Sequence, residues 1–220
     1  QNVYPPGKAF GGPGVFTFNE RAQMDESDPL ASPANAKALF AQWQGYYDLS
    51  RRYLIEKSPP NLIRTRFLQS LFPGSRFIVI LRHPVAVSYA TRKWSNTSIF
   101  SLIEHSLRGY EIFSRDMPHL DAVYILSYEA LVQEPQQTVD AICRFLDIEP
   151  FKMRHGIKRG VNERYFSSWE RDLRKPLNRM RLRITPELEA RARCYGYSLR
   201  DCRKPVSHTC HGAHWNTHKP

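Results

Sequence analysis

The sequence predicts an α/β fold in which a central parallel sheet lies between two layers of helices. Residues 77–81 read FIVIL and are apolar at every position, as expected for a strand that is covered on both faces. A second short apolar run lies at residues 122–126. Stretches with helical periodicity precede and follow both runs, and the alternation of strands with helices is typical of parallel sheets.

The elements that precede the strand at residues 77–81 are predicted from the spacing of apolar residues and from the positions of proline and glycine. A helix is predicted over residues 34–47. The apolar run at residues 53–55 predicts a buried strand, which must end before Pro59 because proline cannot donate to a sheet ladder. Apolar residues then recur at helical spacing over residues 62–72, and Gly74 lies just beyond them as a stop signal.

The elements after residue 81 are predicted mainly by their first residues. Pro84 suits the first turn of a helix. A longer helix is predicted over residues 99–113, and His105 lies among its apolar residues, so packing is favoured over catalysis for this side chain. Another helix is predicted over residues 135–146, and Thr185 begins a last helix with a cap, a proline and an acid.

The strands predicted at residues 53–55 and 77–81 are each followed by a basic residue. Strands joined by a helix should be parallel, with a right-handed crossover, so that their carboxyl ends meet at one edge of the sheet. Lys57 and Arg82 would both lie at that edge, where open α/β sheets bind ligands. Free N–H groups of the helix that begins at Pro84 would add positive potential. Solvated strand ends remain the alternative, but the pattern favours a site for an anion with several phosphates or sulfates.

Composition is consistent with this interpretation. The chain of 220 residues has 32 Lys and Arg against 21 Asp and Glu, a net charge of +11 that suggests an anionic partner. A hydrophobic content of 41% argues against global disorder, and no apolar run reaches the length of a transmembrane helix. Much of the basic excess follows Lys152 and, by default, indicates solvated helix faces.

Several motifs together resemble the sulfotransferases that use 3′-phosphoadenosine 5′-phosphosulfate (PAPS). The EKSPPN segment at residues 56–61 and the LRHP segment at residues 81–84, which leads through a serine to RKW at 92–94, look most like the branch related to tyrosylprotein and carbohydrate sulfotransferases. Similar segments lie at residues 4–14, 43–50 and 127–132.

This resemblance implies a fold, a reaction and an organisation of the chain. The fold would be a P-loop-NTPase-like, three-layer αβα domain over residues 37–202, after a mostly loop segment at residues 1–36. The reaction would move a sulfuryl group from PAPS to a hydroxyl or amine of an acceptor such as a carbohydrate, a tyrosine or a small alcohol, without a metal. The expected location is the Golgi lumen for a eukaryotic protein with an upstream membrane anchor, and otherwise the cytoplasm.

The resemblance also implies roles for particular residues. Arg82 matches the arginine that holds the 3′-phosphate of the cofactor, and Ser88 matches the serine that joins it. Tyr128 matches a tyrosine near the adenine. Lys57 matches a lysine that assists at the sulfuryl centre in some carbohydrate sulfotransferases.

The same resemblance extends to the stretch that follows Arg159. Residues 160–166, which lead to Trp169, resemble the loop that closes over the nucleotide. Arg159 would meet a phosphate there.

The residue types suit sulfuryl transfer, in which positioning and electrostatics do most of the work. Arginine offers a planar fork for a terminal phosphate, and lysine a mobile point charge. Glu56 is the nearest acid to Lys57, but strand alternation would point it the other way, so a structural role is favoured and no general base is identified.

The chain also departs from the family. The family has a second phosphate loop near its N-terminus, with a basic residue followed by Ser/Gly-Thr-Thr at the start of a helix. The glycine-rich residues 11–14 are not followed by such a helix, and Pro13 lacks the N–H that a phosphate cradle uses. We therefore expect an N-terminally incomplete chain, with poor or no catalysis by these 220 residues alone.

Two other functions remain open. One is a sulfotransferase-like module that binds adenosine bisphosphate without catalysis. The other is a basic nucleic-acid-binding protein, which is disfavoured because aromatic residues are not interleaved with the basic ones. The tail at residues 203–220 carries Cys210 and four histidines, but without paired CxxC spacing it predicts a disordered tail, not a zinc site.

Overall fold

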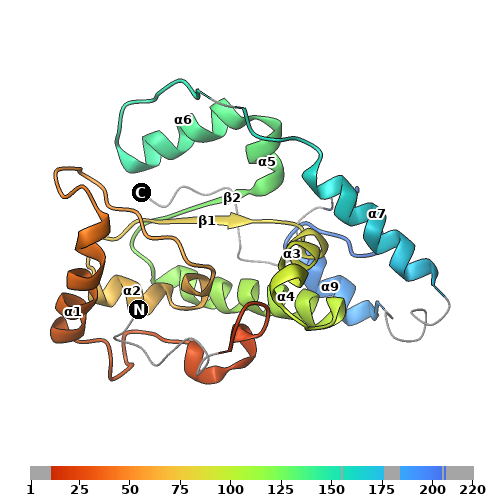
Figure 1. Cartoon of the computed structure of the whole chain (residues 1–220), viewed down its shortest axis with the longest axis horizontal. Coiled ribbons are helices and arrows are strands. Elements are labelled where there is room, and N and C mark those ends of the chain that lie inside the picture. The colour runs from red at the N-terminus through yellow and green to blue at the C-terminus, as the bar shows by residue number, and fades with distance from the viewer. Residues whose placement is uncertain (1–10, 155, 176–183, 205, 207–220) are drawn as a thin grey trace.

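The computed structural model describes residues 11–154, 156–175, 184–204 and 206. This part of the chain contains two strands and eight α-helices, with helices before, between and after the strands (Figure 1). The strands are β1 (Phe77–Leu81) and β2 (Val123–Ser127). The helices are α1 (Pro33–Trp43), α2 (Thr65–Leu71), α3 (Pro84–Thr91), α4 (Ile99–Asp116), α5 (Tyr128–Gln133), α6 (Pro135–Leu146), α7 (Val161–Arg174) and α9 (Pro186–Cys194).

The two strands form a parallel pair whose carboxyl ends lie at the same edge. Phe77 is opposite Val123 at the start of the ladder, and Leu81 is opposite Ser127 at its end. In Figure 1 the pair runs between α5 and α6 on one side and α2 and α4 on the other. The predicted mixed α/β class with a parallel sheet is therefore confirmed.

The strand predicted at residues 53–55 is wrong. This segment has no ladder partner among the described residues, and Ile55 keeps 75% of its surface exposed. The segment is attached through side chains instead: the Tyr53 hydroxyl donates to the Leu146 carbonyl at 2.5 Å, and Arg52 pairs with Asp147 just beyond α6. Lys57 consequently follows an irregular segment and not a strand.

The prediction that residues 77–81 are covered on both faces is also wrong. Val79 and Leu81 point into the main core, whereas Ile78 and Ile80 are 37% and 50% exposed. β1 thus has one packed face and one open face among the described residues. A strand of this kind need not be apolar at every position to pack its inner face.

The main core is organised around α4, which carries a long apolar stripe. The helix begins at a Ser98 cap, whose hydroxyl accepts from the Ser101 N–H. Its buried residues pack against α3, both strands, α7 and α9. His105 is only 8% exposed, and its ring meets Phe16 at 4.3 Å between centroids, so the packing predicted for it is confirmed.

The stretch predicted to be a nucleotide-closing loop begins the helix α7. Gly160 precedes it with a φ of 72°, a left-handed conformation that glycine adopts without strain. Phe166 and Trp169 lie on its buried side, and Glu163 lies in its first turn. An amphipathic pattern with no internal Gly or Pro explains why this segment is helical.

Candidate functional site

Arg82 is the first residue after β1, at the carboxyl end of the sheet. Its backbone is held by Tyr110 of α4: the phenol oxygen accepts from the Arg82 N–H at 3.1 Å and donates to the Arg82 carbonyl at 2.6 Å. Burial raises the pKa of Tyr110, so this phenol stays protonated. The start of the Arg82 side chain is therefore fixed relative to the core.

The Arg82 guanidinium lies between an amide and an aromatic ring. Its Nε and Nη2 atoms donate to Asn162 Oδ1 at 2.8 and 2.6 Å. Its central carbon lies 4.1 Å from the centroid of the Tyr128 ring and 5.6 Å from that of Tyr165. Nη1 has no hydrogen-bond partner in the part of the chain that the structure describes. A half-buried cation thus keeps one edge available.

Glu129, the second residue of α5, collects hydrogen bonds from three directions. Its Oε1 atom accepts from Asn162 Nδ2 at 2.7 Å and from the His83 N–H at 3.2 Å. Its Oε2 atom accepts from the Tyr197 hydroxyl at 3.1 Å. Burial, followed by the charge of Glu129, raises the pKa of Tyr197. The phenol therefore remains a donor to the carboxylate.

His83 follows Arg82 and caps α3. Its Nδ1 atom accepts from the Val85 N–H at 3.2 Å, so Nε2 carries the proton that is donated to the Ser198 carbonyl at 3.1 Å. The ring also packs edge-on against Phe166 and Tyr197. Burial lowers the pKa of His83 to about 4, which leaves the imidazole neutral near pH 7.

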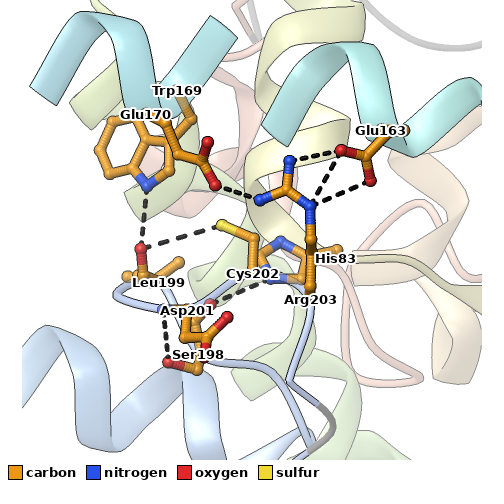
Figure 2. A network of polar contacts seen from close by, with 9 residues as sticks. All are labelled: His83, Glu163, Trp169, Glu170, Ser198, Leu199, Asp201, Cys202 and Arg203. Carbon is orange, nitrogen blue, oxygen red and sulfur yellow. Dashed lines mark hydrogen bonds and ion pairs between the residues drawn. The ribbon is translucent and has the colours of Figure 1, made fainter. Parts of the chain in front are cut away.

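The turn after α9 fastens α7 to this region (Figure 2). The Leu199 carbonyl accepts from Trp169 Nε1 at 2.8 Å, and Arg203 forms ion pairs with Glu163 and Glu170 of α7. The same turn provides Ser198 to His83. α7, which carries Asn162, is thus held by the C-terminal turn on one side and by Arg82 on the other.

The site residues predicted from the sequence do not all lie together in the structure. Arg82 and Tyr128 are brought together. Ser88 is fully buried, and its hydroxyl donates to the Pro84 carbonyl at 2.8 Å within α3, so it presents no surface to a ligand in this structure. Lys57 and Arg159 are both exposed, and neither has an ion pair or hydrogen bond to a described residue.

Glu56 and the tail at residues 203–220 carry the remaining candidate functional groups of the sequence. Glu56 accepts a hydrogen bond from Asn61, which supports a structural role for it. Among the described residues no group of His, Cys, Asp and Glu could hold a metal ion. The tail histidines and Cys210 lie outside those residues.

None of the described helices is long and apolar enough to cross a membrane.

Sequence reasoning did not identify Asn162, Glu129 or Tyr165. Asn162 lies 80 positions from Arg82, and Glu129 lies 33 positions from Asn162, so no local pattern connects them. The only available signal was position: Glu129 follows Tyr128, and Asn162 lies in the segment beyond Arg159 that was expected to close over a nucleotide.

Together these groups form a cationic edge stacked on an aromatic ring at the carboxyl end of a parallel sheet. Such an arrangement suits an anionic group on a ligand that also carries a planar ring. Residues 10–152 match the sulfotransferase family. The chain belongs to the sulfotransferase family. This match contains Lys57, Arg82, Ser88 and Tyr128, whereas Asn162 lies beyond it.

A solved structure supports the same fold. The sulfotransferase domain from the curacin biosynthetic pathway superposes with a TM-score of 0.52 and 17% sequence identity, and the likeness covers 74% of this chain and 68% of that one. At this identity the likeness concerns the fold alone. Among curated proteins no significant match is found.

Proposed function

We propose that this sulfotransferase-family protein uses PAPS to transfer a sulfuryl group to a hydroxyl or amine of an acceptor. The observation that carries the proposal is the Arg82 guanidinium, which lies over the Tyr128 ring and keeps Nη1 without a described protein partner. A terminal phosphate attached to an adenine nucleoside offers an anion and a planar ring, which are the two features that this arrangement recognises.

The proposed roles follow from where the side chains lie. Arg82 binds the 3′-phosphate through its available edge, and Tyr128 contacts the adenosine. Arg159, exposed just before α7, adds a second cation for the nucleotide. Lys57 neutralises charge on the sulfuryl oxygens from the segment at residues 53–57. The buried Ser88 hydroxyl offers no support for the role that the sequence predicted for it.

The transfer breaks the bond between sulfur and the bridging oxygen of the phosphosulfate, and a new bond joins sulfur to the acceptor oxygen or nitrogen. The leaving group departs as adenosine 3′,5′-bisphosphate, and the acceptor loses a proton. Charge spreads over the peripheral oxygens, so fixed cations lower the barrier most. The proposed acceptor classes are carbohydrates, tyrosines and small alcohols, and the structure does not rank them.

The first test is the affinity for adenosine 3′,5′-bisphosphate, measured by isothermal titration calorimetry. Arg82→Ala should weaken binding about 10- to 100-fold, because it removes a charge-assisted contact of about 1.5–3 kcal/mol. Arg115→Ala is the matched control, since Arg115 is exposed on α4 and has no hydrogen bond or ion pair to a described residue. Equal affinity of the Arg82 variant and the wild type would refute the assigned role.

The second test is transfer of labelled sulfate from PAPS to a panel of carbohydrates, tyrosine peptides and small alcohols. Label in an acceptor supports the enzyme. Bisphosphate binding without any transfer supports a non-catalytic module instead. A third outcome is binding to DNA or RNA that weakens steeply with salt and is not altered by the bisphosphate. This outcome would replace the enzyme and the non-catalytic module with a nucleic-acid-binding function.

A further inference from the structure

We propose that Asn162 and Glu129 are positioning residues that orient the Arg82 guanidinium for the phosphate. The inference rests on the proposed function, because it concerns the same ligand. Neither residue need touch the nucleotide. Each acts through the next: Glu129 holds the Asn162 amide, and the Asn162 amide holds Arg82.

The first step concerns which edge of Arg82 is used. A guanidinium carries five N–H groups in one plane. Nε and Nη2 each direct one of them to Asn162 Oδ1. Both Nη1 hydrogens and the second Nη2 hydrogen remain. One Nη1 hydrogen and this Nη2 hydrogen lie together at the end of the guanidinium, and the two form the end-on fork that binds phosphate in a bidentate manner. Asn162 therefore occupies the side edge and leaves the end edge for the ligand.

The second step concerns the orientation of the Asn162 amide. Arginine can only donate hydrogen bonds, and an ionised carboxylate can only accept them. The amide oxygen must then face Arg82, and the amide nitrogen must face Glu129. A flipped amide would set N–H against N–H and oxygen against oxygen. Glu129 thus selects the orientation in which Asn162 can accept from Arg82.

The third step concerns charge. An acid at position 162 would pair with Arg82 and compete with the phosphate for it. The neutral amide orients the guanidinium without cancelling its charge. Arg82 has no ion pair with any carboxylate of the described residues, and Glu129 is instead shared among Asn162, the His83 N–H and Tyr197. The site keeps a fixed cation that no described carboxylate contacts directly.

The fourth step concerns rigidity. The three residues come from separate elements: the end of β1, the start of α5 and the start of α7. Each is anchored elsewhere, Arg82 through Tyr110, Glu129 through Tyr197, and α7 through Trp169 and Leu199. The orientation of the fork is therefore set by the packed fold and not by a flexible side chain.

The test compares two nucleotides on four variants. Affinity for adenosine 3′,5′-bisphosphate and for adenosine 5′-monophosphate is measured on Asn162→Ala, Asn162→Asp, Glu129→Gln and Ser168→Ala. The last is the control, because Ser168 lies on α7 and its hydrogen bonds to described residues stay within that helix. Circular dichroism and urea unfolding establish that each variant is folded.

The positioning role predicts a specific pattern. Asn162→Ala should weaken the bisphosphate about 10-fold and leave the monophosphate unchanged, because only the 3′-phosphate meets Arg82. Asn162→Asp should weaken it more than Asn162→Ala, although aspartate has nearly the shape of asparagine. A purely structural role would give the opposite order, and it would affect both nucleotides alike.

A second measurement needs no ligand. The Arg82 Nε–H, followed by NMR, should exchange slowly with solvent in the wild type and in Ser168→Ala. Exchange should accelerate several-fold in Asn162→Ala and, to a smaller extent, in Glu129→Gln, where a neutral amide makes a weaker hydrogen bond to Asn162.

The two measurements separate the two proposals. If the wild type does not bind the bisphosphate, the proposed function fails, and the inference about phosphate positioning fails with it even if exchange changes as expected. If the wild type binds but Asn162→Ala binds equally well, the positioning role fails while the function stands. If the Arg82 Nε–H exchanges in Glu129→Gln at the wild-type rate, Glu129 has no part in positioning Arg82.

Discussion

Arg82 and His83 are neighbours in the chain, yet their surroundings give them opposite electrostatic states. Arg82 is charged and keeps an available edge beside Tyr128. His83 is buried and neutral, with both ring nitrogens used in hydrogen bonds to the protein backbone. One residue is the proposed anion-binding group, whereas the other fixes the first turn of α3 to the C-terminal turn.

The neutral state of His83 predicts a loss of stability in mild acid. Its pKa is lowered from 6.5 to about 4 in the folded protein, so between these values the unfolded chain binds more protons. The free energy of unfolding should therefore fall as the pH falls through this window. For His83 alone the loss between about pH 7 and about pH 5 is roughly 2 kcal/mol. Urea unfolding at the two pH values measures it.

The matched variant is His83→Asn, in which the amide oxygen can still cap α3 but cannot take up a proton. It should be less stable near pH 7 because the ring no longer packs against Phe166 and Tyr197. Its stability should depend less on pH than that of the wild type. The dependence that remains comes from His105, because burial also lowers the pKa of His105 to about 4. An unchanged pH dependence would contradict the assignment to His83.

At the scale of elements, Glu189 of α9 fixes the C-terminal turn that braces α7. Glu189 is 5% exposed, and its carboxylate accepts from the Ser198 hydroxyl at 2.7 Å and from the Leu199 N–H at 2.9 Å. Burial alone would raise the pKa of Glu189, but the hydrogen bonds from Ser198, Arg193 and two backbone amides hold it below its usual range. The carboxylate is therefore the stable form.

Replacement of this carboxylate by an amide should destabilise the protein. Glu189→Gln presents an N–H group to neighbours that are donors, so we expect a loss of about 2–3 kcal/mol in the free energy of unfolding. Urea denaturation followed by circular dichroism measures the change. Glu187→Gln, on an exposed position of the same helix, should cost less than about 0.5 kcal/mol. Similar losses in both variants would show that Glu189 is not special.

Most helices could be predicted because their signals are local. Pro84 and Thr185 mark helix starts through their own backbone preferences and caps. The false strand at residues 53–55 shows the limit, since an apolar triplet looks the same whether or not it finds a ladder partner. Arg82 was found because it directly follows a predicted strand at the ligand-binding edge of the sheet, whereas Tyr128 was found because a family resemblance marks it. Asn162 was not, because its role exists only through distant contacts.

At the scale of the whole molecule, the two faces of β1 have different surroundings. Val79 and Leu81 point into the core, and Ile78 and Ile80 do not. Ile80→Thr should therefore change the free energy of unfolding by less than about 0.5 kcal/mol. Val79→Thr introduces the same hydroxyl on the packed face and should cost about 1–3 kcal/mol. Equal costs in urea unfolding would mean that the outer face is packed too.

The Tyr110 hydroxyl joins both backbone groups of Arg82 to the central helix α4. If this end of β1 frayed, the buried Tyr110 hydroxyl would lose both hydrogen-bond partners. The free-energy cost is about that of losing a contact in the core. Local opening at the carboxyl end of the sheet is therefore coupled to opening of α4. The proposed ligand site and α4 therefore belong to one cooperative unit, and we expect a substitution deep in α4 to weaken binding without touching the ligand.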